Sequence, residues 1–352
     1  MDVITIGSAI RDVFVAPEGD EVLTSAKFPT GEGLCLPLGA KLRIDHLDIT
    51  LGGDALNTAV TFARRGFKTA TIAKVGADAT GKEIAERLAA EGVSTRFLLR
   101  DKKLQTAYSI ILLADNGDRT VLTYGGATRN FGPADLPWQQ LKPKWFFVTH
   151  LSEKSAAVFP RLLRHAKRVG AKIAVNPGKT QLTMPLSKIK PLLNMIDVFV
   201  VNREEASYLT RVPYAEEEKI FGRLDSWVKG LVVMTDGPKG VTVSDGTTRW
   251  KAGVLKERKI VDRTGAGDSF GSGFVAGLIE AGGGLSPRAR RGGTVPPEHA
   301  PEAIRHAIQV GSANATSVVE TIGGNAGALR KDQSIYKWGR LAIKEQGIGY
   351  RG

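Results

Sequence analysis

The residues best suited to chemistry lie in one stretch, Val261 to Gly273, which reads Val-Asp-Arg-Thr-Gly-Ala-Gly-Asp-Ser-Phe-Gly-Ser-Gly. Its Thr-Gly-Ala-Gly part is a turn that only small residues can make, and a helical run with Phe270 and Phe274 follows from Asp268. The first N–H groups of a helix lack partners inside it, so this turn favours an anion. A carboxylate beside an anion site can take the proton from a hydroxyl that attacks a phosphate. The alternative is that Asp268 only caps the helix.

Residues 262–270, Asp-Arg-Thr-Gly-Ala-Gly-Asp-Ser-Phe, carry a family resemblance. The segment resembles the C-terminal signature of the ribokinase family of sugar kinases, the PfkB carbohydrate kinases. The resemblance implies that Asp268 is the catalytic base. It also implies that the main-chain N–H groups of Gly265, Ala266 and Gly267 form the anion hole.

A second segment, Gly52-Gly-Asp-Ala-Leu-Asn57, opens a helix and resembles the N-terminal signature of the same family. The resemblance implies that Gly52, Gly53, Asp54 and Asn57 contact a sugar, and that Asp12 holds substrate hydroxyls. Asp12 follows the first buried strand, where open α/β sheets bind ligands. The plainer interpretations are a surface turn for Asp12 and helix capping for Asp54. Ribokinases proper carry Lys where this chain has Asp54, which questions ribose itself as the substrate but not a polyol.

The later half of the chain resembles the nucleotide-binding elements of the family. Asn202 and Glu205 stand three apart at a helix start, which implies a phosphate and Mg²⁺ environment with Glu205 holding Mg²⁺ through water. A capping pair is the alternative for these two residues. Thr235, Gly237 and Gly240 resemble the turn that lies along the nucleotide, which would be ATP.

Two further sites follow from the same resemblance near the C-terminus. Asn314 and Ser317, in a long helix predicted over 303–319, stand where the family packs adenine. The alternative is an alanine-rich helix of the core. Asp262, together with carbonyls of Gly323 and Gly324, corresponds to a monovalent cation site, so K⁺ is a candidate beside Mg²⁺.

Strands and helices alternate from end to end, which predicts a mostly parallel sheet with helices on both faces. The resemblance implies a single PfkB-type kinase domain over 1–352, a ribokinase-like three-layer α/β/α sandwich with a small β-strand lid. We expect the lid segments at about 11–51 and 105–125, with an Asn-Gly hairpin turn within 115–118, and a basic insertion at about 282–300. We also expect a strand end at 259–261 and a final helix over 334–346.

The composition is that of an ordinary globular protein, with 42% apolar and 24% charged residues. The chain has no run of about 18 apolar residues, no secretory signal pattern and one cysteine, Cys35. These features predict a cytoplasmic protein with no membrane span and no internal disulfide. Lid strands with open edges favour a homodimer, because open edges tend to be covered.

The net charge of +13 is compatible with nucleic acid, with an anionic substrate or simply with a basic cytosolic protein. Arg161, Arg164 and Arg168 are spaced along one helix face. A solvated helix face is the plainer interpretation. No helix-turn-helix, zinc-finger or RNP pattern accompanies the charge, so nucleic acid is not an expected partner.

Other nucleotide-binding motifs fail at defining positions. Residues 76–83 nearly form a P-loop, but Glu83 replaces the Ser or Thr that holds Mg²⁺. Residues 265–277 lack the Gly-x-Gly-x-x-Gly spacing of a dinucleotide-binding fold.

The first hypothesis for the function is therefore an ATP-dependent kinase acting on a sugar hydroxyl. A nucleoside kinase is second. A sugar-phosphate kinase, with Arg43, Arg119 and Arg129 as candidate cations, is third. A non-catalytic basic nucleic-acid binder is the hypothesis from another class.

Overall fold

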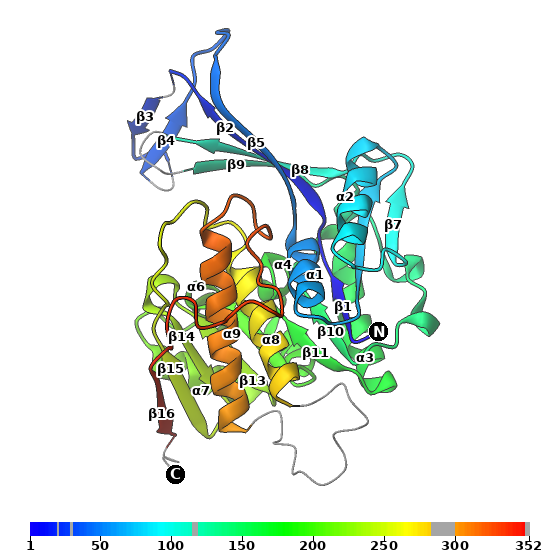
Figure 1. The fold of residues 1–352 in the computed structure, drawn as a ribbon, viewed down its shortest axis with the longest axis vertical. Coiled ribbons are helices and arrows are strands. Elements are labelled where there is room, and N and C mark those ends of the chain that lie inside the picture. Colours follow the sequence, from blue (N-terminus) through cyan, green and yellow to red (C-terminus); the bar gives the residue numbers. More distant parts are fainter. Residues whose placement is uncertain (20, 29–30, 115–118, 283–299, 349–352) are drawn as a thin grey trace.

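A computed structural model describes residues 1–19, 21–28, 31–114, 119–282 and 300–348. In this part of the chain, ten strands form a central sheet in the order β16-β15-β14-β13-β12-β11-β10-β1-β6-β7, with helices on both faces (Figure 1). The strands are β1 Val3–Ile6, β6 Thr69–Gly76, β7 Leu98–Asp101, β10 Trp145–Val148, β11 Lys172–Val175, β12 Val198–Asn202, β13 Leu231–Thr235, β14 Val241–Ser244, β15 Thr248–Ala252 and β16 Ile343–Gly347.

The central strands are parallel and buried on both faces. Strand β1 pairs with β10 and β6, and parallel pairing continues from β10 through β11 and β12 to β13. Strands covered on both faces read as continuous apolar runs, as in Trp145-Phe-Phe-Val148, which is buried throughout. Only β14, β15 and β16 add antiparallel pairs. The predicted mostly parallel sheet is confirmed.

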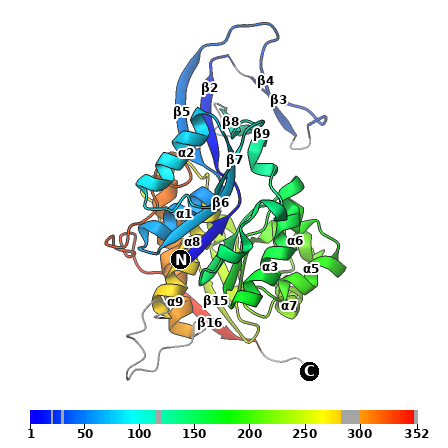
Figure 2. The same ribbon diagram turned by 90° about the vertical axis from the view of Figure 1, so that its right-hand side faces the viewer.

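Two layers of helices enclose the sheet (Figure 2). On one face lie α1 Asp54–Arg64, α2 Ala79–Ala90, α8 Ala266–Ala281 and α9 Pro301–Val319. Phe62 of α1, Phe274 of α8 and Ile304 of α9 share one apolar cluster there. On the other face lie α3 Val158–Val169, α4 Lys179–Leu182, α5 Leu186–Leu193, α6 Arg203–Thr210 and α7 Glu217–Trp227. Leu162 of α3 and Phe221 of α7 belong to the cluster of this second face.

Short 3₁₀ helices complete the connections, at Gly126–Arg129, Pro133–Asp135, Trp138–Gln140, Glu153–Ala157 and Gly237–Lys239. No helix of the described residues has the length and apolar character that crossing a membrane requires.

A four-stranded sheet extends from the body as the lid (Figure 1). Its order is β5-β2-β8-β9, formed by β5 Ile44–Gly52, β2 Ile10–Pro17, β8 Ala107–Leu113 and β9 Arg119–Tyr124, and a small pair, β3 Glu21–Thr24 and β4 Glu32–Cys35, lies beyond it. Successive side chains of a strand point to opposite faces. One lid face therefore carries Asp12 and Phe14, which are buried, and the other carries Val13 and its neighbours.

Two expected elements are wrong. Residues 259–261 form no strand; the N–H of Val261 instead donates to the carbonyl of Val319 at the end of α9. Residues 334–346 form no helix: their last part belongs to β16, which pairs with β15 and so satisfies the main-chain groups of that edge. The predicted turn at 115–118 and nearly all of the predicted 282–300 insertion lie outside the described residues.

Candidate active site

The Asp268 carboxylate lies in the first turn of α8, behind a left-handed turn at Gly265. Gly265 has φ 72°, and a Cβ there would lie 2.6 Å from the Cα of Gly324, so only glycine fits. The N–H of Ala266 donates a 3.3 Å hydrogen bond to the carbonyl of Arg263, whereas Gly267 is exposed. The N–H groups of this first turn that remain available, with the helix dipole, suit an anion.

Asn57 links Asp268 to helix α1. Its Nδ2 donates to Asp268 Oδ2 at 3.1 Å. Its Oδ1 accepts from Asn325 Nδ2 at 2.9 Å, and Asn325 also donates to the carbonyl of Leu51 at 2.7 Å. Because Asn325 has no acceptor group directed at Asn57, the Asn57 amide is held in the orientation that donates to Asp268.

Charged side chains on the side of Asn325 away from Asn57 fix its position. Arg87 of α2 donates to Asn325 Oδ1 at 3.3 Å and pairs with Glu91 at 3.0 Å. Arg64 of α1 makes two hydrogen bonds to Glu91, at 2.8 and 2.7 Å, and also donates to the carbonyl of Ala326 at 2.8 Å. This support was not predicted from the sequence, because residues of α1, α2 and the loop after α9 meet only in the folded chain.

Asp12 lies on the inner lid face beside the turn that begins α1. Burial raises the pKa of Asp12 to about 6; a hydrogen bond with Ser109 lowers it, while the charges of Asp262 and Asp54 raise it. A Cβ on Gly52 would collide with the Asp12 carboxylate. Gly53, the residue before α1, has φ 96° and packs on the carbonyl of Ser8. The two glycines thus bring main chain close to the carboxylate.

Asp54 begins α1 one turn before Asn57. Burial raises the pKa of Asp54, and the nearby His150 partly offsets the rise. Burial also raises the pKa of Asp268, and the negative charge of Asp54 raises it further, while the hydrogen bond from Asn57 lowers it. Asp12, Asp54 and Asp268 therefore form an acidic group at the carboxyl ends of the sheet strands.

A cavity of about 180 Å³ opens on the other side of the Gly265 turn; we call it the α8 cavity. It brings together five predicted residues, Thr235, Gly237, Gly240, Ala266 and Gly267. Its other walls are mostly apolar and include Val241, Gly253, Val254, Leu255, Phe270, Ser312, Ala315 and Thr316. A cavity with apolar walls and a few hydroxyl groups suits the flat purine or pyrimidine ring of a nucleotide.

Asn314 and Ser317 do not line the α8 cavity; Ser312, Ala315 and Thr316 of the same helix do. Asn314 is fully buried. Its amide donates to Thr61 Oγ1 at 3.2 Å and to the carbonyl of Ser269 at 2.8 Å, and accepts from the N–H of Leu329 at 2.8 Å. These internal bonds use both N–H groups of the amide and one lone pair of its oxygen, and the nucleotide contact through Asn314 stays a prediction.

Asn202 and Glu205 cap α6 reciprocally. Asn202 Oδ1 accepts from the N–H of Glu205 at 2.8 Å, and Glu205 Oε2 accepts from the N–H of Asn202 at 2.9 Å. Asn202 is also the register partner of Thr235, beside the α8 cavity. Burial raises the pKa of Glu205, and the hydrogen bond from the Asn202 N–H partly offsets this rise.

Among the described residues, no cluster of three or more acidic, His or Cys side chains could hold a metal ion. Mg²⁺ at Glu205 would therefore need water and phosphate ligands.

A larger cavity of about 810 Å³, the lid cavity, lies between the lid and residues 260–263. Its walls combine apolar and charged side chains, namely Phe14, His46, Asp48, Leu113, Arg119, Ile260, Val261, Asp262, Arg263 and Ile322. Of the three arginines considered for a sugar phosphate, only Arg119 is among them. Arg129 pairs with Glu153 at 2.9 Å instead.

Asp262, for which a K⁺ site stays a prediction, contacts three neighbouring groups. Its Oδ1 accepts from the N–H of Thr264 at 2.8 Å, and its Oδ2 accepts from the N–H of Gly323 at 3.1 Å. Arg119 lies 3.7 Å from Oδ1 and supplies the positive charge. Gly323 thus presents its N–H, not its carbonyl, to this carboxylate.

The site therefore places a half-buried carboxylate, Asp268, in the first turn of α8, beside the Gly265 turn and the α8 cavity. Comparison with known proteins shows the family: residues 20–331 match the model of the pfkB family carbohydrate kinases. The chain belongs to this family. It is a carbohydrate kinase.

Relatives of this kinase act on different acceptors. It is 29% identical over 248 residues to a ribokinase of Haemophilus influenzae, covering 69% of this chain and 78% of that one. It is 25% identical over 280 residues to a cytidine kinase of Thermococcus kodakarensis, covering 79% and 88%. The structure of Arabidopsis thaliana ribokinase complexed with ribose and ATP superposes with a TM-score of 0.73, at 21% identity, over 94% of this chain and 96% of that chain. The ribokinase-like fold is confirmed.

Replacing Asn325 by Ala in this kinase should impair the chemical step. The Asn57 amide would lose its orientation, and weaker donation to Asp268 would raise the Asp268 pKa. We expect kcat to fall roughly ten- to a hundredfold and the acidic limb of the kcat–pH profile to move to higher pH. Asn130→Ala is the control, since Asn130 donates to Asp101 away from the site. An unchanged pH profile would contradict this positioning role.

Replacing Asp12 by Asn should stabilise the kinase above pH 6. The folded-state pKa of about 6 exceeds the ordinary 3.8, so the folded protein binds the proton more tightly than the unfolded chain. Stability is therefore lost as pH rises from about 4 to 6, and the full penalty of about 3 kcal/mol applies above it. Urea unfolding at pH 8 should show Asp12→Asn the more stable protein. At pH 4 the difference should be much smaller; an equal difference at both pH values would refute the assignment.

Proposed function

We propose that the protein transfers the γ-phosphoryl group of ATP to a hydroxyl of an uncharged sugar, with Asp268 as the general base. One observation carries the proposal. Asp268 directly follows Gly267 of the α8 cavity, which suits a nucleotide, and it accepts a hydrogen bond from Asn57 on the side of Gly52 and Asp12, which suits a polyol. A hydroxyl held at Asp268 would therefore face a phosphate held at the start of α8.

In this proposal Asp268 takes the hydroxyl proton while the hydroxyl oxygen forms a bond to the γ-phosphorus. The bond from that phosphorus to the bridging oxygen breaks, and ADP leaves. The raised pKa of Asp268 makes it a stronger base than an exposed carboxylate. The main-chain N–H groups of the Gly265–Gly267 turn would bind the transferring phosphoryl group, a kind of interaction typically worth about 10²–10³ in rate.

Mg²⁺ is part of the proposal. Glu205, with one oxygen engaged by the Asn202 N–H, would hold it through water, and the ion would neutralise charge on the nucleotide phosphates. We do not include K⁺ at Asp262, because Arg119 and two N–H groups already face that carboxylate.

The acidic group of Asp12, Asp54 and Asp268 favours an acceptor without charge near the reacting hydroxyl. Carboxylates accept hydrogen bonds from hydroxyls, but they repel a phosphate. A sugar is therefore the first choice. A nucleoside is second, favoured by the size of the lid cavity and by the cytidine kinase relative. A sugar phosphate is third and would depend on Arg119 and Arg263.

The basic face of α3 gives little support to the nucleic-acid alternative. Arg161 stacks over the ring of Trp138 at 4.7 Å, and Leu162 and Leu163 on the opposite side are buried. This is the arrangement of an amphipathic surface helix.

Asp268→Asn tests the proposed chemistry. The variant keeps the shape of the side chain but cannot accept the proton, so we expect kcat to fall by at least about 10³-fold while ADP and the acceptor still bind. Turnover should be measured as ADP release with Mg-ATP over pentoses, hexoses, their phosphates and nucleosides. Near-normal turnover by Asp268→Asn would remove the mechanism; saturating activity only with phosphorylated acceptors would remove the neutral-sugar assignment.

We further propose a homodimer formed through the outer lid face. Ile49, Val13, Ile110 and Leu122 are register partners across β5, β2, β8 and β9. Ile49, Ile110 and Leu122 are 54%, 40% and 52% exposed, which makes a continuous apolar row on a sheet with open edges. Apolar rows of this kind favour covering by a partner.

Replacing both Ile49 and Leu122 by Lys should convert the dimer to monomer. Two charges on each copy would be buried against an apolar surface, which is costly. Light scattering after size exclusion should show half the wild-type mass at equal concentration. Tyr208→Lys, at a 61% exposed site on α6, serves as control and should remain dimeric. A monomeric wild-type protein at all accessible concentrations would end this proposal.

A further inference from the structure

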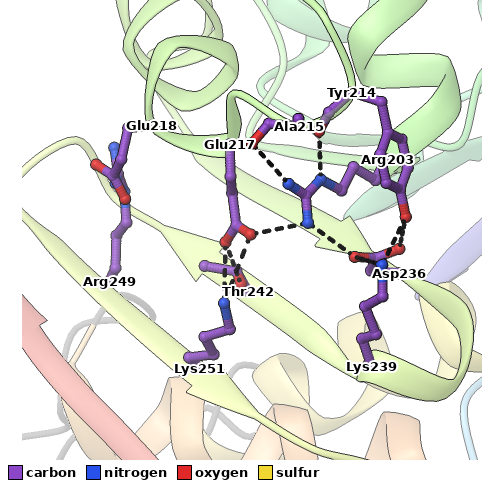
Figure 3. A network of polar contacts seen from close by, with 10 residues as sticks. All are labelled: Arg203, Tyr214, Ala215, Glu217, Glu218, Asp236, Lys239, Thr242, Arg249 and Lys251. Atoms are coloured by element: carbon purple, nitrogen blue, oxygen red, sulfur yellow. Dashed lines mark hydrogen bonds and ion pairs between the residues drawn. The ribbon is translucent and has the colours of Figure 1, made fainter.

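A network of ion pairs centred on Arg203 joins the start of α6 to the turn after β13 (Figure 3). Arg203 is the first residue of α6, and its side chain is only 11% exposed. Its Nη1 lies 2.9 Å from Asp236 Oδ2 and 3.1 Å from Glu217 Oε2. Its Nε donates to the carbonyl of Tyr214 at 2.9 Å. The guanidinium thus makes directed contacts on three sides.

Tyr214 completes the enclosure of Asp236. The guanidinium of Arg203 stacks on the Tyr214 ring at 4.6 Å, and the Tyr214 hydroxyl donates to Asp236 Oδ1. Lys239 lies 3.7 Å from Asp236 Oδ2. Burial would raise the pKa of Asp236, but the hydrogen bonds from Tyr214 and Arg203 and the charge of Lys239 hold it below its usual range. Both carboxylate oxygens of Asp236 therefore have fixed partners.

Asp236 begins the turn Asp236–Gly240, which forms a wall of the α8 cavity. The N–H of Asp236 donates to the carbonyl of Gly240 at 2.8 Å, and the N–H of Lys239 donates to the carbonyl of Asp236 at 2.9 Å. Gly237 and Gly240 line the cavity, and both have positive φ, at 49° and 95°. Since glycines allow this main chain to adopt other shapes, the contacts of the Asp236 side chain restrict it together with these main-chain hydrogen bonds.

The same arginine is fixed at its other end by the capped start of α6. It follows Asn202 directly, and the capping pair Asn202–Glu205 holds the first turn of α6. Glu217 also lies 3.3 Å from Lys251 of β15 and 3.3 Å from Thr242 of β14. The network therefore joins the proposed Mg²⁺ and phosphate residues to the turn along the nucleotide.

We infer that Arg203 is a positioning residue for the donor nucleotide: it holds the Asp236–Gly240 turn against the start of α6, so that the α8 cavity is formed before the nucleotide binds. Arg203 does not line the cavity and is not a catalytic residue. The inference rests on the proposed function in one respect, that the α8 cavity takes the nucleotide. Preformed walls reduce the ordering that binding requires, and this increases affinity.

Arg203→Met tests the inference, because Met fills much of the space but lacks the charge and the five N–H donors. We expect nucleotide affinity to fall by about tenfold or more, seen as weaker ADP binding by calorimetry and a higher KM for ATP. The acceptor KM should stay within about twofold, and kcat at saturating ATP within about threefold.

Arg249→Met is the matched control. Arg249 on β15 is also poorly exposed, pairs with Glu218 and with Asp225 at 3.7 Å, and stacks on Phe221 at 4.7 Å. It makes none of the contacts of Arg203 with the Asp236–Gly240 turn. The Arg249→Met variant should have a lowered melting temperature, as Arg203→Met should, but its ADP affinity should change by less than about twofold.

Tyr214→Phe is a milder variant that keeps the ring and removes only the hydroxyl bonded to Asp236. It should weaken ADP binding in the same direction by a smaller factor, and it keeps the inference testable should Arg203→Met fail to fold. Wild-type ADP affinity in both Arg203→Met and Tyr214→Phe, or equal losses in Arg203→Met and Arg249→Met, would overturn the inference alone. A wild-type protein that binds no adenine nucleotide would instead overturn the proposed function, and the inference with it.

Discussion

The arrangement of this protein depends on a hydrogen bond from the buried side chain of Asn57 to the half-buried side chain of Asp268. These residues are far apart in the sequence and stand near the starts of two helices, α1 and α8, that cover the same face of the sheet. Shielding a carboxylate from water without a hydrogen-bond donor costs free energy, so the Asn57 amide stabilises the ionised Asp268 side chain. The glycine turn before α8 and the main chain at Gly324 approach each other without side chains, which leaves room for this contact.

The cost of gathering acidic groups is met by the groups around them. Burial raises the pKa of Asp12, Asp54 and Asp268, and the negative charge of Asp54 raises the pKa of the other two further. Each has a compensating neighbour, Ser109 for Asp12, His150 for Asp54 and Asn57 for Asp268. Sites that hold carboxylates in a poorly solvated place sacrifice some stability for reactivity. The continuous apolar strands of the central sheet and two layers of helices provide the rigid frame that tolerates this loss.

Much of the fold could be predicted from local patterns. Buried parallel strands such as 145–148 are short apolar runs, and helix starts such as 265–268 carry glycine turns, so both leave a signal in neighbouring residues. The errors have equally local causes. Residues 334–346 have the length of a helix, but the open edge of β15 recruits their end as β16. Residues 259–261 end in a short apolar pair, but the N–H of Val261 donates to the carbonyl of Val319 at the end of α9 and not to a strand.

The sequence by itself determined the class of fold and the place of the carboxylate that we propose as the base, because the Thr-Gly-Ala-Gly-Asp segment specifies its own turn and helix start through backbone sterics and capping. Only the tertiary structure decided which side chains hold that segment and its surroundings in place. Asn325 reaches Asn57, and Arg203 reaches Asp236, through contacts between residues that are distant in the chain. Such contacts depend on the packing of whole elements, and no pattern among neighbouring residues encodes them.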